Sequence, residues 1–344
     1  MQGIVREKSN EIACVLCGAA AGGELPEGKS DCLVPPYVVY CAQETYQRMR
    51  MAEWIVYAVV SALLTGLMPS FLKTGIKKAA PALGAALFSS VVLLFAAGVV
   101  AMEARAGEIL ESGNETLLYL VLSGALQGVV WLCLSAALIH GNVNRVIPIT
   151  NLHVCGALGI SLWLFHTTIS VWKLCCILLL LFGTLLLESR PDKGGNGKWA
   201  LFAFLALFAS AAKTLTDMLY LPESVISVSV ANAVRTAIST VVLWCAALLG
   251  KSLNSAKRIT ADGWIFLVLA GMAIGVAWLC DSRAALLGDS SYLLPISCTA
   301  FPVALLGARI FHKEEMPAGA MFGILFIRYV MHALSVYLLS SGTR

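Results

Sequence analysis

Residues 120–150 read LVLSGALQGVVWLCLSAALIHGNVNRVIPIT, and residues 267–297 read LVLAGMAIGVAWLCDSRAALLGDSSYLLPIS. At a constant offset of 147 and without a gap, 14 of the 31 positions are identical. The shared positions include the pairs Gly124/Gly271, Gly128/Gly275, Trp131/Trp278, Cys133/Cys280, Gly141/Gly288 and Pro148/Pro295. Chance similarity between apolar helices supplies matching Leu and Val, but it does not keep Gly, Trp, Cys and Pro in register. The pattern predicts an internal repeat.

The composition around this repeat is that of a membrane protein. Apolar and aromatic residues make up 59% of the 344 residues, charged residues 13%, and the mean hydropathy is +0.82. A soluble domain of this size has about 25% charged residues to cover its surface. The apolar runs are continuous and do not alternate with period two, which favours helices over a barrel. The small net charge of +4 argues against a nucleic-acid partner.

Ten apolar stretches are long enough to cross a hydrocarbon core of about 30 Å, which takes about 17–25 helical residues. They lie near 54–72, 81–102, 116–139, 146–165, 170–187, 199–217, 225–249, 263–287, 292–311 and 317–339. We therefore expect an all-α polytopic membrane protein with a first five-helix repeat over 51–189, a linker over 190–198 and a second five-helix repeat over 199–344. The offset of 147 spans five helices, an odd number, so the two copies enter the membrane in opposite directions. Inverted repeats are typical of transporters, whose binding site lies between the halves.

Residues 1–50 are polar and contain no membrane span, so we expect a disordered tail. Two alternatives are open. The short apolar run at 12–21 could belong to a signal peptide, although Glu7 and Glu11 spoil its positively charged region. The spacing of Cys14 and Cys17 could indicate zinc, but no second close pair follows. The disordered tail remains our prediction over both alternatives, and we expect no metal site.

Residues 283–325, RAALLGDSSYLLPISCTAFPVALLGARIFHKEEMPAGAMFGIL, resemble the second half of EamA-like proteins of the drug/metabolite transporter superfamily. Residues 54–187 resemble the same unit more loosely. Two features depart from the family pattern. The hairpin acid Glu314 has Thr167 as its counterpart at the offset of 147, and the tenth helix carries Arg328 and His332.

The resemblance implies ten helices in two inverted bundles, a central cavity, no cofactor, and coupling to a proton or to an exchanged solute. It further implies a multi-pass protein of the cell membrane whose partners are a small-molecule solute and the lipid bilayer, with a homodimer as an open option. It places both termini in the cytoplasm. The distribution of Lys and Arg among the loops favours the opposite orientation.

Ionisable residues within the spans are the first candidates for a substrate site, because each costs roughly 2.5–3.5 kcal/mol at the centre of a helix. Lys213 and Asp217 share one face of the sixth helix at i and i+4. They could form a substrate or proton site, or a pair near the helix end that neutralises itself. Arg235 lies deep in the seventh helix, one turn after Asn232. We favour pairing of Arg235 with an acid on a neighbouring helix over binding of an anion.

Polar and aromatic residues near the repeat supply the other cavity candidates: Gln127 and Trp131 in the third helix, Asn151 and His153 in the fourth, Trp278 in the eighth, and Ser297 and Thr299 in the ninth. Those of the fourth and ninth helices follow a proline, which leaves nearby backbone groups free. Packing is the more common role for a single Trp, and a helix-contact hydrogen bond for a single His. The Gly-xxx-Gly pairs at 124/128 and 271/275 suit close helix packing.

No catalytic motif stands out, and we expect no enzyme activity. The sequence lacks HExxH, GxSxG, a glycine-rich phosphate loop and a paired acidic run. The prediction is a transporter of small metabolites or drugs, an exporter that works by alternating access. Two alternatives remain: an intramembrane enzyme acting on a lipid-soluble substrate, and a membrane partner protein that transports nothing.

Overall fold

In a computed structural model, the fold is described for residues 36–153, 197–220, 226–287, 296 and 299–314, and every element in those ranges is a helix. Six of these helices are long and apolar enough to cross a membrane: Glu53–Ile76, Pro81–Met102, Asn114–His140, Lys198–Asp217, Val228–Leu249 and Ala261–Ala284. They correspond to the first, second, third, sixth, seventh and eighth predicted spans. The predicted spans at 170–187 and 317–339, with Arg328 and His332, lie outside the described residues.

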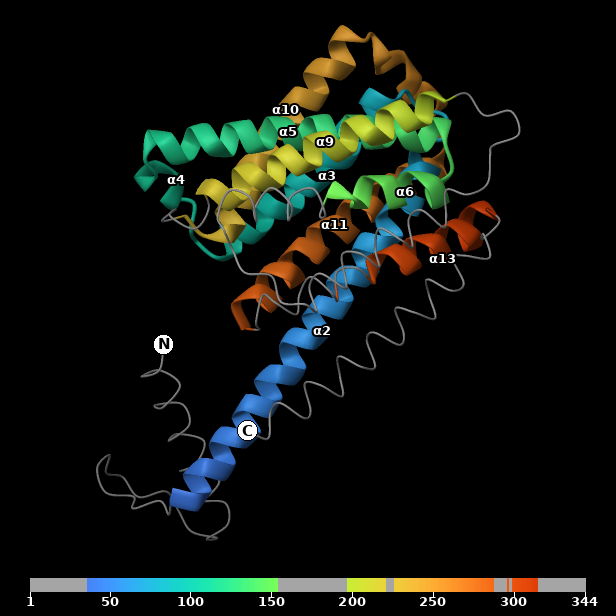
Figure 1. Ribbon diagram of the computed structural model, residues 1–344. Coiled ribbons are helices and arrows are strands. Elements are labelled where there is room, and N and C mark those ends of the chain that lie inside the picture. Colours follow the sequence, from blue (N-terminus) through green and yellow to red (C-terminus); the bar gives the residue numbers. More distant parts are fainter. Residues whose placement is uncertain (1–35, 154–196, 221–225, 288–295, 297–298, 315–344) are drawn as a thin grey trace.

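The elements follow one another along the chain as shown in Figure 1. Their bounds are α2 Pro36–Ile76, α3 Pro81–Met102, α4 Glu108–Glu111, α5 Asn114–His140, α6 Val143–Asn151, α9 Lys198–Tyr220, α10 Val228–Leu249, the 3-10 helix η1 Ser252–Arg258, α11 Ala261–Leu287 and α13 Ala300–His312. The fourth and ninth predicted spans are thus described in part, by α6 and α13.

The N-terminal part of α2 differs from the sequence prediction. Residues 36–50, expected in a disordered tail, form the first turns of this 41-residue helix and extend beyond the other described helices (Figure 1). Once a helix has formed, each further residue adds one backbone hydrogen bond, so the helix can continue without an apolar sequence. Hydropathy therefore located the membrane span but not the end of the helix.

Local sequence signals set several helix ends. α3 begins with Pro81, which needs no N–H partner at the first position of a helix. At the start of α10, the hydroxyl of Ser227 accepts the N–H of Val230 at 3.5 Å. α13 ends at Lys313, whose φ of 53° is left-handed, and the N–H of Glu314 bonds to the carbonyl of Ala308 at 3.4 Å. This turn directs Glu314 back toward the bundle.

The helices pack in two similar groups (Figure 1). In one group α11 packs against both α2 and α3, and α13 packs against α2. In the other group α5 packs against both α9 and α10, and α6 packs against α9. The two groups join where α10 packs against α3 and where α13 contacts α6.

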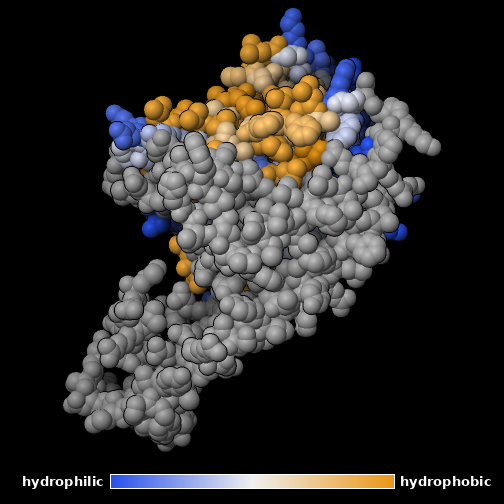
Figure 2. Space-filling view, viewed as in Figure 1, coloured by the Kyte–Doolittle hydropathy of each residue, from blue (hydrophilic) through white to orange (hydrophobic). Residues whose placement is uncertain are grey.

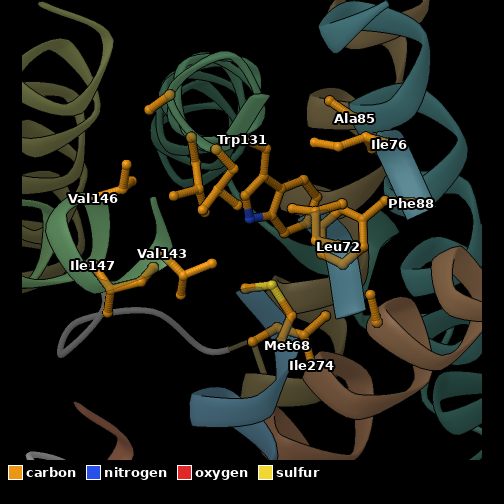
Figure 3. Close-up of a cluster of buried hydrophobic side chains, with 14 of the residues drawn as sticks. Met68, Leu72, Ile76, Ala85, Phe88, Trp131, Val143, Val146, Ile147 and Ile274 are labelled. Atoms are coloured by element: carbon orange, nitrogen blue, oxygen red, sulfur yellow. The ribbon is translucent and has the colours of Figure 1, made fainter. Parts of the chain in front are cut away.

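The main core lies where α2, α3, α5, α6 and α11 meet (Figure 3). Trp131 of α5 is 3% exposed, and its ring meets that of Phe88 edge-on at 5.0 Å between centroids. Leu72 and Ile76 of α2 and Val143 of α6 are fully buried around these rings. Large apolar residues thus fill the bundle at this point and leave it closed.

The outer surface is apolar over much of its area. Figure 2 shows hydrophobic side chains over a broad part of the described surface, with hydrophilic residues near its edges. The exposed residues include Leu118 and Leu122 of α5, Phe204 and Phe208 of α9, and Met272 of α11. In water such a surface would drive aggregation, whereas lipid chains solvate it well. The helix faces are therefore suited to a bilayer.

The offset of 147 found in the sequence is kept in the helix bounds. Adding 147 to the bounds of α3 gives those of α10, and adding it to the bounds of α5 gives those of α11. A Cβ at Gly124 of α5 would lie 2.7 Å from the carbonyl oxygen of Arg235 in α10. A Cβ at Gly271 of α11 would lie 2.7 Å from Val91 of α3. Both glycines allow the close helix packing predicted from the Gly-xxx-Gly pairs.

We expect Gly124→Ala and Gly271→Ala to lower the melting temperature of the purified protein in detergent. Each added methyl group meets the backbone or a β-branched side chain of the facing helix, and such overpacking costs about 1–3 kcal/mol. Gly98→Ala in α3 is the matched control, because no atom of the described residues lies within 4 Å of its Cβ position. The control is expected to be neutral or slightly stabilising. Equal melting temperatures for all three variants would contradict the assigned packing role.

Candidate functional site

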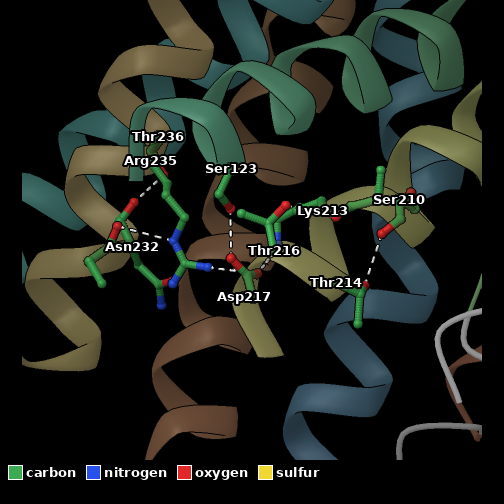
Figure 4. A network of polar contacts seen from close by, with 11 residues as sticks. Ser123, Ser210, Lys213, Thr214, Thr216, Asp217, Asn232, Arg235 and Thr236 are labelled. Atoms are coloured by element: carbon green, nitrogen blue, oxygen red, sulfur yellow. Dashed lines mark hydrogen bonds and ion pairs between the residues drawn. The ribbon is translucent and has the colours of Figure 1, made fainter. Parts of the chain in front are cut away.

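Asp217, near the end of α9, is the centre of a charged network inside the bundle (Figure 4). Its Oδ1 accepts the hydroxyl of Ser123 from α5 at 2.6 Å. Its Oδ2 accepts the ammonium of Lys213, one helical turn earlier, at 2.7 Å. The same Oδ2 also pairs with Nη1 of Arg235 from α10 at 2.8 Å. One carboxylate therefore joins three helices.

Arg235 makes two further contacts on its own helix. Its Nε donates to the carbonyl of Ala231 at 3.2 Å, and its Nη2 donates to Oδ1 of Asn232 at 2.9 Å. The side chain is 9% exposed. The structure confirms the predicted pairing of Arg235 with an acid on a neighbouring helix, because Asp217 lies in α9. Substrate binding by Lys213, Asp217, Asn232 and Arg235 stays a prediction.

The packing of α5 explains how these groups meet. Gly124 lets the backbone of α10 approach at Arg235 itself, since both the carbonyl oxygen and the Cα of this residue lie within 3.1 Å of the missing Cβ. The preceding residue, Ser123, points toward Asp217 of α9 (Figure 4). Two neighbouring residues of α5 thus bring α9 and α10 to the distance at which Asp217 and Arg235 can pair.

The network has no charged counterpart at the offset of 147. The corresponding residues are small or apolar: Ser70 for Asp217, Gly66 for Lys213, Ala270 for Ser123, Phe88 for Arg235 and Ala85 for Asn232. Phe88 and Ala85 are fully buried in the main core. The first copy of the repeat therefore packs without charges at the equivalent positions. The charged network is a feature of the second copy.

A cleft with about 340 Å³ of empty space adjoins the network between α3, α10 and α11. Its walls are mostly apolar, with Phe95 and Val99 from α3 and Leu279 from α11. Two residues predicted from the sequence, Asn232 and Trp278, also line it. Asn232 therefore belongs to both the charged network and the cleft.

The two tryptophans of the repeat face each other near the middle of the bundle. The rings of Trp131 and Trp278 stack with 5.9 Å between centroids and an interplanar angle of 16°. Trp131 is buried in the core, which agrees with a packing role, whereas Trp278 is partly exposed and reaches the cleft. The two tryptophans at equivalent positions of the repeat thus have different surroundings.

The other predicted site residues are more scattered. Gln127 is buried in α5, one turn from Trp131. Nδ1 of His153 donates to the carbonyl of Thr150 at 2.7 Å. Thr299 donates to the carbonyl of Ile296 at 2.7 Å, just before α13. Ser297 and the side chain of Asn151 lie outside the described residues.

Sequence reasoning missed Ser123. It lies one helical turn before Gln127 on α5, so the spacing that singled out Gln127 and Trp131 could have included it. A serine is common in packed membrane helices, however, and no charge marks it.

A second polar cluster lies at the other end of the bundle and joins α2, α6 and α13. The carboxylate of Glu314 accepts the ammonium of Lys73 at 2.7 Å and the backbone N–H groups of Val143 and Asn144, both at 3.1 Å. Lys73 also donates to the carbonyl of Gly141 at 2.9 Å. The carboxylate therefore caps the first turn of α6, where free N–H groups and the helix dipole favour a negative charge.

We expect Asp217→Asn to be strongly destabilising. The change leaves two cations close together without a counter-charge, and breaking a buried ion pair in this way costs about 3–5 kcal/mol. Asp262→Asn, at an exposed position in the first turn of α11, is the matched control and is expected to cost less than about 1 kcal/mol. The measurement is the midpoint of unfolding by sodium dodecyl sulfate. Similar midpoints for both variants would show that Asp217 does not hold the network together.

Comparisons with known proteins also indicate a transporter. Residues 52–189 match the model of the EamA-like transporter family. A Sinorhizobium protein described as an uncharacterized transporter in the cobO 3′ region is 27% identical over 141 residues, which cover 40% of this chain and 95% of that protein.

Proposed function

Because residues 52–189 place this chain in the EamA-like transporter family, a family of multi-pass membrane proteins, we propose that it moves small metabolites or drugs across the cell membrane. It acts as an exporter by alternating access between two inverted halves of five helices each, and it releases the solute chemically unchanged. The observation that carries the proposal is the charged network of Asp217 beside a cleft in an otherwise apolar bundle.

Equivalent helix contacts support the inverted halves. Gly124 faces Ile238, and Gly271 faces Val91. Both the glycines and their partners differ by 147. The same relation holds one turn further along, where Gly128 faces Val242 and Gly275 faces Phe95. A duplicated unit that packs in the same way twice accounts for these paired contacts.

The directions of the helices support inversion. α5 begins after α4, next to the end of α3, and ends at Gly141, which contacts Lys73 at the end of α2. α11 begins next to Gly75, also at the end of α2, and its Arg283 lies 3.7 Å from Glu103 at the end of α3. The two equivalent helices thus run in opposite directions, as expected for an offset of five helices, an odd number.

The two ends of the bundle support alternating access. The cleft lies in the halves of α3 and α11 that lead to Glu103 and Arg283, around Trp278. At the other end, Phe88 and Trp131 fill the equivalent space, and Glu314 and Lys73 tie the helix ends together. A transporter in one of its two states has one end open and the other closed.

The first test compares the metabolites released by cells that overexpress the chain with those released by cells that overexpress Lys213→Ala. We expect at least one solute to accumulate outside the cells about tenfold more slowly with the variant, because its ammonium is lost from the proposed site. Lys257→Ala, on the exposed 3-10 helix, is the matched control. Identical profiles for Lys213→Ala and the unchanged chain, at equal membrane levels, would remove Lys213 from the site.

Purified protein in liposomes then separates the three classes of function. A transporter moves that solute with unchanged mass, an enzyme returns a different molecule, and a partner protein does neither.

The second test concerns the closed end. Ser70 is fully buried one turn from Lys73, and its carbonyl contacts Nε2 of His312 at 3.1 Å. We expect a Ser70→Cys thiol to react slowly with a membrane-impermeant maleimide. Adding Glu314→Gln should speed this reaction several-fold, because the pair with Lys73 loses its charge. Labelling of this peptide is measured by mass spectrometry, and an unchanged rate would contradict a closing role for Glu314.

A further inference from the structure

We propose that the network of Asp217, Lys213 and Arg235 binds the anionic group of the transported solute, a small organic anion whose apolar body lies in the cleft lined by Asn232 and Trp278. This inference rests on the proposed transport function and adds the class of substrate to it. It is built on the charges, on the hydrogen-bond donors that remain, and on the lining of the cleft.

The charges do not balance. Lys213 and Arg235 supply two positive charges and Asp217 supplies one negative charge. In the described ranges of the chain, Asp217 is the one carboxylate that contacts either cation. The side chains of Lys213, Arg235 and Asp217 are 22%, 9% and 20% exposed, so water screens these charges little. A surplus positive charge in an apolar bundle is costly, and an anionic ligand would offset that cost.

Arg235, Lys213 and Asn232 have N–H donors that the contacts described above do not use. Both oxygens of Asp217 are occupied, Oδ1 by Ser123 and Oδ2 by the two cations. Arg235 has five N–H groups and Lys213 has three, of which the contacts described above use only some. The oxygen of Asn232 accepts from Arg235, which leaves its NH₂ group as a donor at the cleft. Such N–H donors are suited to a carboxylate or a similar anion.

The cleft determines the rest of the ligand. About 340 Å³ of space lies between its walls, but part of it is open to solvent, so the cleft is not an enclosed pocket. Phe95, Val99, Trp278 and Leu279 present apolar and aromatic surface to it. Asn232 lines the cleft and accepts a hydrogen bond from Arg235, so it connects the cleft with the charged network. An apolar body with one anionic group matches this arrangement.

The other copy of the repeat argues against a purely structural role. Phe88, Ala85 and Gly66 occupy the places of Arg235, Asn232 and Lys213 and pack without charges. The fold therefore does not need a cation at either place. A structural ion pair would be satisfied by one cation and one carboxylate, whereas an anion site needs the second cation.

The test measures binding of radiolabelled benzoate and of its neutral isostere benzamide to the purified full-length protein in detergent, by equilibrium dialysis. We expect the unchanged protein to bind benzoate at least about tenfold more tightly than benzamide. Arg235→Gln and Lys213→Gln each leave a neutral pair around Asp217, and each should bring this ratio close to one. Arg235→Lys keeps the charge and should retain part of the preference.

Lys257→Gln on the exposed 3-10 helix is the matched control and should keep the full preference. Each variant is first checked by size-exclusion chromatography for a monodisperse protein. A ratio near one in the unchanged protein, including no binding of either probe, overturns the proposal. So does a full preference for benzoate in both glutamine variants.

Flux in liposomes distinguishes this proposal from transport itself. Movement of cellular solutes or of benzamide without a preference for benzoate leaves the transporter in place and removes the anion site. Selective binding of benzoate without movement of any solute supports the anion site and contradicts transport.

Discussion

The close approach of α5 to α10 at Gly124 is the contact on which most of the described structure depends. A side chain at this position would push the two helices apart, because the carbonyl oxygen of Arg235 lies 2.7 Å from the missing Cβ. The approach also brings Arg235 of α10 within 2.8 Å of Asp217 of α9. Gly271 gives α11 the same approach to α3. Backbone contact thus organises both the bundle and its charges.

Two carboxylates of the described bundle each have several partners. Asp217 has three partners, from its own helix, α5 and α10. Glu314 likewise has three, Lys73 and the first N–H groups of α6. In an apolar environment a carboxylate with fewer partners would be too costly to keep ionised. The two clusters therefore act as fixed points between helices whose other contacts are mostly apolar, with a few polar pairs such as Arg283 with Glu103.

The two clusters lie in different parts of the bundle. Glu314 joins the end of α13 to the start of α6 and the end of α2, where the core around Trp131 is filled. Asp217 lies beside the cleft that Trp278 lines. Among the described residues, large side chains fill the core around Trp131, whereas a cleft remains beside Asp217. This difference is the basis of the proposed alternating access and of the proposed anion site.

The sequence by itself determined the helical membrane class, the positions of the six described spans and the offset of 147, and it placed Lys213 and Asp217 on one face of a helix. These features follow from composition and from the helical period, which act over a few residues. Only the tertiary structure showed that Asp217 is the partner of Arg235, that Ser123 binds it from 94 positions away, and that Glu314 caps α6 while pairing with Lys73, 241 positions away. Helix packing decides such contacts, and no local periodicity encodes which helix faces meet.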